Sequence, residues 1–421
     1  MKYASTLMMA AAVTAIMTGP ALACPAKIGA TLSLTGSYAT FGPPISQAAE
    51  MAVEQLNAAG WNVAGCSKLD YLVRDDQTQP SVGVDAARRL IDIDGVPAIV
   101  GPISSGVAVS VVSSVAVEKN VLVIPSAASS PTFTELAREG KLKGLFYRIQ
   151  PSDSLAAVAA AKFAVDAGFK KMAIVNVNND WGNNIVKQFT ATYKALGGQI
   201  TGAVTYNPEQ ASYRAEVNKA LAGNPDSLFM PASVIDGSKV LRDWIALGGP
   251  QKFLFPQGLG DAKLIENVGE QYLKDAIFMT PGTPEPNSVK FYRDAYQARW
   301  NLPGVGPGRD QGYDAAMLIG LAMAAAKNYK EGPAIAAAVP KVTDPKGEMI
   351  YANVEDLRKG LKLLAEGKTI RYVGATGAMV HDKYGDVTLP FIGMVVENKA
   401  FVNKKNISSQ EMADIKAKTG T

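Results

Sequence analysis

Two adjacent serines, Ser104 and Ser105, stand between glycines where a strand is expected to give way to a helix. The apolar residues 98–100 predict a buried strand, and residues 107–119 predict a helix. A helix N-terminus presents unpaired N–H groups, and small hydroxyl residues let an anion approach them. Because the lysine of a phosphate-binding loop is missing, we interpret the stretch as a carboxylate cradle. On these residues alone, a simple serine N-cap remains the alternative.

Further candidate binding residues follow other expected strands in the same way. A turn or cap role is the alternative for each, because turns favour these residue types. Trp181 is the most informative, because an indole at a strand-to-helix turn is costly to leave in water and suits an apolar ligand. The full set of candidates is Phe41, Ser104, Ser105, Ala127, Ser129, Trp181, Ser233 and Gln257.

The chain offers little for catalysis. Its single histidine, His381, is expected on a solvated surface turn, and with only two cysteines a typical zinc site is not expected. No Gly-x-Ser-x-Gly elbow occurs, and the glycines of residues 304–308 do not follow a strand as a dinucleotide fingerprint would. We therefore expect a binding protein without enzymatic activity, metal or cofactor.

Short strands alternate with helices along two successive series. The first series covers residues 28–126, and the second begins with a helix at 152–167. Most strands are apolar on both faces, which is typical of parallel strands covered by helices on each side. The sequence thus predicts an α/β fold with two doubly wound parallel-sheet lobes, and a ligand site in the cleft outside the carboxyl ends of the strands.

The chain is expected to cross between the lobes three times, near residues 146–151, 281–286 and 374–377. The predicted N-terminal lobe comprises residues 24–148 and 281–373. The predicted C-terminal lobe comprises residues 149–280 and 374–421. Three crossings indicate a hinge.

Residues 1–23 have the pattern of a cleaved secretory signal peptide. Lys2 precedes an apolar run that ends before the Ala21-Leu22-Ala23 site, and the run is shorter than the roughly 20 residues that span a bilayer. Cleavage removes one positive charge, so the formal net charge falls from +4 to +3. With no block of like charge, a nucleic-acid partner is not expected. We predict an exported, soluble periplasmic protein.

Cys24 and Cys66 each precede an expected strand of the first lobe. If those strands are parallel neighbours, both cysteines lie at one sheet edge within bridging reach, and an oxidising compartment permits the disulfide. Acylation of Cys24 as a lipoprotein is the alternative, although Ala21 stands where such signals normally have leucine.

The chain resembles the extracytoplasmic solute-binding proteins of branched-chain amino-acid ABC transporters, which have the type I periplasmic binding protein fold. The resemblance covers essentially the whole mature chain. Singly its motifs are weak, but their order and spacing are specific. They are LTGSYATFG (34–42), DD (75–76), VGPISS (100–105), IPSAASSP (124–131), FYR (146–148), PSD (151–153), DWG (180–182) and YDA (313–315).

The resemblance implies roles for individual residues. Ser105 and the backbone of Ala127 would grip a carboxylate, with Ser129 nearby for the carboxylate or the amino group. Phe41 and Trp181 match positions where family members place an aromatic ring over the ligand.

Two positions depart from the amino-acid binders. Ser233 stands where they have tyrosine, and Gln257 stands where a glutamate holds the ligand's ammonium. A neutral amide removes that charge-assisted hydrogen bond. Either another acid, such as Asp180 or Asp310, supplies the charge, or the ligand lacks an amino group.

We therefore expect a monomeric binding protein that captures a branched-chain or other hydrophobic amino acid for uptake through an ABC-transporter permease. One alternative within the class is a binder of an aromatic or aliphatic carboxylic acid or amide. The alternatives outside it are the ligand-binding subunit of a signalling receptor and an exported hydrolase.

Overall fold

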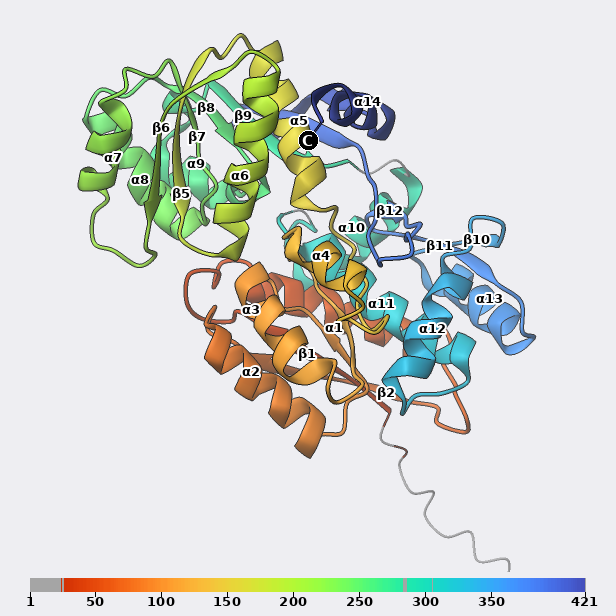
Figure 1. The fold of residues 1–421 in the computed structure, drawn as a ribbon. Coiled ribbons are helices and arrows are strands. Elements are labelled where there is room, and N and C mark those ends of the chain that lie inside the picture. Colours follow the sequence, from red (N-terminus) through yellow and green to blue (C-terminus); the bar gives the residue numbers. More distant parts are fainter. Residues whose placement is uncertain (1–23, 25, 283–285, 305, 421) are drawn as a thin grey trace, which may run out of the picture.

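The computed structural model describes residues 24, 26–282, 286–304 and 306–420. The chain forms two lobes, each built on a sheet of mainly parallel strands covered by helices (Figure 1), which confirms the predicted two-lobe α/β fold. Among the helices of these residues, none is long and apolar enough to cross a membrane. The predicted signal peptide, residues 1–23, lies outside the described residues.

The N-terminal lobe is organised around a four-stranded, wholly parallel sheet with the strand order β2-β1-β3-β4. Its inner strands are apolar on both faces and buried, because helices pack on each side. Helix α1 packs along α11, and α11 along α12. The strands are β1 (Ala26–Leu32), β2 (Leu69–Asp75), β3 (Ala98–Val100) and β4 (Leu122–Ile124). The helices are α1 (Gly42–Ala58), α2 (Pro80–Arg88), α3 (Ser105–Val111), α4 (Thr132–Arg138), α10 (Pro286–Trp300), α11 (Arg309–Ala326), α12 (Gly332–Val342) and α13 (Val354–Ala365).

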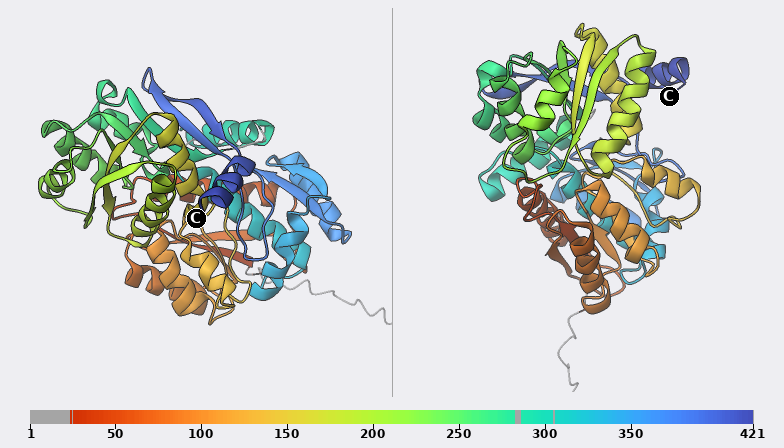
Figure 2. Two further views of the ribbon diagram at one scale, coloured as in Figure 1. Left: turned by 45° about the horizontal axis from the view of Figure 1, so that its top comes forward. Right: turned by 60° about the vertical axis from the view of Figure 1, so that its left-hand side comes forward.

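The C-terminal lobe contains a seven-stranded sheet with the order β14-β13-β9-β8-β7-β5-β6. The five strands from β9 to β6 are parallel, whereas β13 and β14 are antiparallel and extend one edge. The strands are β5 (Lys171–Val177), β6 (Gln199–Tyr206), β7 (Ser227–Phe229), β8 (Lys252–Phe255), β9 (Asp275–Pro281), β13 (Phe391–Glu397) and β14 (Ala400–Ile407). The helices are α5 (Asp153–Asp166), α6 (Asp180–Ala195), α7 (Arg214–Leu221), α8 (Val234–Ala246), α9 (Ala262–Val268) and α14 (Ser409–Thr419), and α14 packs against α5 (Figure 2).

A small third sheet joins β10 (Glu348–Tyr351), β11 (Ile370–Gly374) and β12 (Gly377–Ala378). The chain makes a tight hairpin between β11 and β12, in which Gly374 pairs with Gly377, so β12 completes this sheet instead of the large one.

The chain passes between the lobes three times, which agrees with the predicted crossings. The first passage lies between α4 and α5, the second between β9 and α10, and the third between β12 and β13. The lobe boundaries that we placed at residues 148, 281 and 374 stay a prediction.

Cys24 and Cys66 form a disulfide, as predicted, with their Cα atoms 5.3 Å apart. The reason is the register of the sheet. Strands β1 and β2 are parallel neighbours, and Ala26 pairs with Leu69, so the residues just before the two strands meet at the same edge. The bond closes the N-terminal end of the described chain onto the β1–β2 connection.

Candidate ligand-binding site

A cavity lies between the lobes at the carboxyl ends of the strands, where open α/β folds bind ligands. It encloses about 420 Å³ of space that no atom fills, part of it open to solvent. Five of the eight predicted binding residues line it, namely Phe41, Ser105, Ala127, Trp181 and Gln257. Four further lining residues were not predicted, namely Tyr38, Ile103, Gly258 and Pro307.

Ser105 is the best-defined polar group of the cavity. Its hydroxyl oxygen accepts hydrogen bonds from the backbone N–H groups of Ser129 and Ser130, both at 3.2 Å. A hydroxyl has two acceptor lone pairs and one proton. With both lone pairs engaged, the Ser105 hydroxyl acts toward the cavity as a donor, and a carboxylate or carbonyl oxygen is its natural partner.

The turn after β3 brings Ser105 to this position. Gly101 lets the strand β3 turn sharply, because its φ is +88° and a Cβ atom would stand 2.2 Å from the carbonyl oxygen of Thr31. Ser104 takes the N-cap position of α3 but makes no side-chain cap bond, and it does not line the cavity. Ser104 thus occupies the cap position without a side-chain cap bond, whereas the Ser105 hydroxyl bonds to the turn after β4.

Ser129 lies behind the cavity wall rather than in it. Its side chain is buried and its carbonyl oxygen accepts the backbone N–H of Asp153 at 2.8 Å. Burial raises the pKa of Asp153 to about 7, while the Ser129 hydroxyl, the charge of Arg148 and the Trp181 indole act in the opposite direction. Asp153 is thus a titratable acid beside two predicted binding residues, Ser129 and Trp181. The sequence did not indicate it as a partner for a ligand ammonium group.

Aromatic rings from both lobes form the apolar part of the cavity. Tyr38 and Phe41 follow β1, with ring centroids 5.8 Å apart, and Trp181 starts α6 on the opposite lobe. Gly258 leaves room for the indole, because a Cβ there would stand 3.1 Å from Trp181 Cη2 and 2.6 Å from the Ala232 carbonyl oxygen. The arrangement suits a flat or branched apolar group between the rings.

Gln257 belongs to a row of three side-chain amides. Its Oε1 accepts from Gln150 Nε2 at 2.8 Å, and Gln150 Oε1 accepts from Gln311 Nε2 at 3.3 Å. The row joins the C-terminal lobe, the first passage and helix α11. Since every member is neutral, this end of the cavity offers polar contacts without a charge.

Ser233 is not brought into the cavity. Its hydroxyl accepts the backbone N–H of Asp236 at 3.3 Å and donates to the Asp236 carboxylate at 3.2 Å, so it caps α8.

The two acids that we considered as ammonium partners, Asp180 and Asp310, do not line the cavity either. Asp180 accepts from Thr132 and Asn184, and burial together with Asp314 raises the pKa of Asp310 to about 7. No lining residue among those described carries a charge.

Polar contacts hold the lobes together around the cavity. Ser37 Oγ donates to Glu209 Oε1 at 3.2 Å, and Thr132 Oγ1 donates to Asp180 Oδ1 at 3.2 Å. Arg309 and Asp261 form a third contact, an ion pair at 3.8 Å. The structure thus shows the lobes closed on each other, with Phe41 and Trp181 both buried.

His381 is not the solvated turn residue that we expected. Its Nε2 lies 3.0 Å from the carbonyl oxygen of Arg148, and its ring packs edge-on against Tyr147. Burial lowers its pKa to about 4. The histidine stands outside the cavity and supports the third passage of the chain.

The unpredicted lining residues differ in how the sequence could have revealed them. Tyr38, Ile103 and Gly258 lie within three residues of a predicted site residue, so reading the whole strand-end turns would have included them. Pro307 comes from the loop before α11, which reaches the cavity only because α11 packs against α1.

Comparison with known proteins places these observations in context. Residues 25–360 match the family model described as "Periplasmic binding protein". The Leu/Ile/Val-binding protein BraC3 of Rhizobium johnstonii is 29% identical over 280 residues, which is 66% of this chain and 73% of that protein.

Two solved structures share the fold. One is the leucine-binding protein LivK of Thermotoga maritima, with a TM-score of 0.76 and 21% identity, covering 91% of this chain and 99% of that one. The other is a solute-binding protein of an ABC transporter from R. palustris in complex with benzoate, with a TM-score of 0.72 and 18% identity, covering 91% and 96%.

Proposed function

The chain belongs to the periplasmic binding protein family, and we propose that it captures a small, largely apolar carboxylate between its lobes. In this proposal it works as an exported monomer that hands the ligand to the permease of an ABC transporter, without catalysing a reaction. The ligand favours the closed arrangement, because only there do residues of both lobes touch it.

The donor state of Ser105 carries the proposal. With both lone pairs of its hydroxyl engaged by Ser129 and Ser130, the free proton suits a ligand carboxylate oxygen. A hydrogen bond to a charged acceptor is about twice as strong as one between neutral groups. The rings of Phe41 and Trp181 then cover the apolar body of the ligand.

Among such carboxylates we favour one without an ammonium group, such as an aromatic acid. An ammonium needs a charged or strongly polar acceptor when it is buried. The lining near Gln257 offers only the neutral row of amides. Benzoate is therefore our probe of choice, and the R. palustris protein with a similar fold, which was solved in complex with benzoate, supports this choice.

A hydrophobic amino acid is the second candidate, and Asp153 is the observation that favours it. This buried acid lies beside Ser129 and Trp181, so an ionised Asp153 would provide the missing negative charge. The name of the R. johnstonii relative points to the same ligands.

A thermal-shift screen of aromatic acids against branched-chain amino acids separates the two candidates. Ligand that binds only the folded protein raises its melting temperature. We expect benzoate or a hydroxylated benzoate to give the larger shift. A shift with leucine, isoleucine or valine and none with aromatic acids would replace the first candidate by the second.

A further inference from the structure

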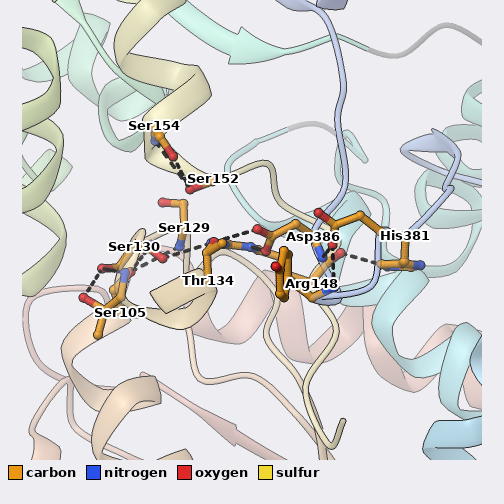
Figure 3. Close-up of polar contacts among 12 residues, drawn as sticks. Ser105, Ser129, Ser130, Thr134, Arg148, Ser152, Ser154, His381 and Asp386 are labelled. Atoms are coloured by element: carbon orange, nitrogen blue, oxygen red, sulfur yellow. Dashed lines mark hydrogen bonds and ion pairs between the residues drawn. The ribbon is translucent and has the colours of Figure 1, made fainter. Parts of the chain in front are cut away.

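Arg148 lies in the first passage and is completely buried. Its guanidinium donates hydrogen bonds to two side chains and one backbone carbonyl (Figure 3). Nη1 donates to the carbonyl oxygen of Ser130 at 3.0 Å, Nη2 donates to Thr134 Oγ1 at 2.6 Å, and Nε donates to Asp386 Oδ1 at 2.6 Å. The residue therefore joins the turn after β4, helix α4 and the third passage.

Asp386 is the counter-charge of this arginine. Its second oxygen accepts the hydroxyl of Thr134 at 2.6 Å, so Thr134 accepts from Arg148 and donates to Asp386. The backbone adds two contacts between the passages. The N–H of Arg148 donates to the Gly385 carbonyl at 2.9 Å, and His381 binds the Arg148 carbonyl.

The contact with Ser130 connects this cluster to the cavity. The carbonyl of Ser130 is held by Arg148, and the N–H of the same residue donates to Ser105 Oγ. The Arg148 guanidinium thus helps to orient the peptide groups of Ser130. Their orientation in turn determines whether the Ser130 N–H reaches the Ser105 hydroxyl.

We infer that Arg148 and Asp386 are positioning residues for the carboxylate-binding hydroxyl of Ser105. Through these two residues, the third passage influences how tightly the cavity binds its ligand. This inference rests on the proposed function. Neither residue lines the cavity, so each acts through Ser130.

The charge of Asp386 is what keeps the guanidinium in place. A buried arginine without its counter-charge is strongly unfavourable and moves toward other acceptors or water. The Ser130 carbonyl then loses its charged donor and keeps the Phe133 N–H at 3.4 Å, so the Ser129–Ser130 turn is held less firmly and opens more often. One lone pair of the Ser105 hydroxyl is released, and the hydroxyl is no longer oriented as a donor toward the ligand.

A purely structural role would make the same residues important for stability alone. Asp314 is a suitable control for that role. It is also a buried carboxylate, and it accepts hydrogen bonds from Tyr372, Ala375 and Thr376 just before the third passage. Within the described part of the chain its hydrogen bonds do not reach Arg148 or Ser130, so Asp314→Asn should destabilise the fold without disturbing the Ser105 hydroxyl.

Hydrogen–deuterium exchange of the ligand-free protein, with its disulfide intact, provides the first test. In Asp386→Asn the amides of Ser129 and Ser130 should exchange on the order of tenfold faster than in the wild type. In Asp314→Asn their exchange should stay unchanged. Equal exchange in Asp386→Asn and the wild type, or equal acceleration in both variants, would overturn the inference.

Calorimetric titration with benzoate and with leucine provides the second test. Whichever probe the wild type binds, Asp386→Asn should weaken it on the order of tenfold, and Asp314→Asn should stay within about twofold. If the wild type binds neither probe, the proposed function fails, and the exchange experiment still decides the positioning role.

If Asp386→Asn does not fold, Thr134→Val replaces it. Valine keeps the shape of threonine but removes the hydroxyl that bridges Arg148 and Asp386. Faster exchange at Ser130 together with weaker probe binding supports the inference, and unchanged values contradict it.

Discussion

The side-chain amide of Gln150 donates to the side-chain carbonyl of Gln257 at 2.8 Å. This bond links the first passage to the C-terminal lobe at the edge of the cavity. Both side chains are neutral, whereas a carboxylate would be needed at this position to hold a ligand ammonium group. The residue at position 257 should therefore affect which ligand the protein prefers.

Gln257→Glu should shift the preference of the protein from benzoate toward leucine. A carboxylate at this position repels the carboxylate of an aromatic acid and attracts an ammonium, so the ratio of the two affinities should change by about tenfold or more. Calorimetric titration with both probes measures it. The control is Gln297→Glu, the same substitution at an exposed residue of α10, which should leave the ratio of the two affinities unchanged.

Gly258→Ala should weaken binding of either probe, because the new methyl group would collide with the Ala232 carbonyl and press on the Trp181 ring. Overpacking of this kind typically costs about 1–3 kcal/mol. The control is Gly260→Ala two residues further on, where the nearest atoms to a Cβ lie 3.6 and 4.0 Å away. Similar affinities for the two variants would show that the indole does not cover the ligand.

Benzoate binding should weaken as the pH rises through about 7. Burial raises the pKa of Asp153 to about 7, so this acid is neutral below that pH and negative above it. A negative Asp153 repels a bound carboxylate, which lowers the affinity at the higher pH. Titrations at about pH 6 and pH 8 measure the difference, and Asp153→Asn should remove it.

Leucine should respond in the opposite direction if Asp153 holds its ammonium. Its affinity would then rise with pH through the same range and fall in Asp153→Asn. An affinity for benzoate that does not change with pH in the wild type would show that Asp153 is too far from the ligand to matter.

Reduction of the Cys24–Cys66 disulfide should lower the free energy of unfolding by about 2–4 kcal/mol, because the bond closes a long loop in the unfolded chain. Urea unfolding of the Cys24→Ser, Cys66→Ser double variant against the wild type measures the change. Mass spectrometry of the mature protein is the complementary check, since an added lipid in place of a two-proton loss would contradict the bond.

The sequence was sufficient for the elements that repeat a simple pattern. The short apolar strands and the helix capped by Ser152 lie within a few residues of their predicted positions, because burial on both faces leaves an unambiguous apolar run. The segment from α12 to β11 was not predicted. Strand β10 has one buried residue among four, and β11 has no exposed one, so neither shows the regular alternation of a half-buried strand; the two pair in parallel with each other.

The site was predictable where it depends on strand ends and not where it depends on packing. Ser105 and Trp181 reach the cavity because each follows a strand directly. Ser233 also follows a strand, but its hydroxyl is engaged by Asp236 in capping α8. The connection from Ser130 through Arg148 to Asp386 joins residues more than 200 positions apart, and no local pattern indicates it.

The most direct test of the central claim compares Ser105→Ala with Ser104→Ala in calorimetric titrations with benzoate and leucine. The two serines are adjacent, but only Ser105 lines the cavity and has its lone pairs engaged. We predict that Ser105→Ala loses about 1–3 kcal/mol of binding free energy for the probe that the wild type binds, while Ser104→Ala keeps it. Equal affinities of the two variants and the wild type would contradict the carboxylate-binding role of Ser105.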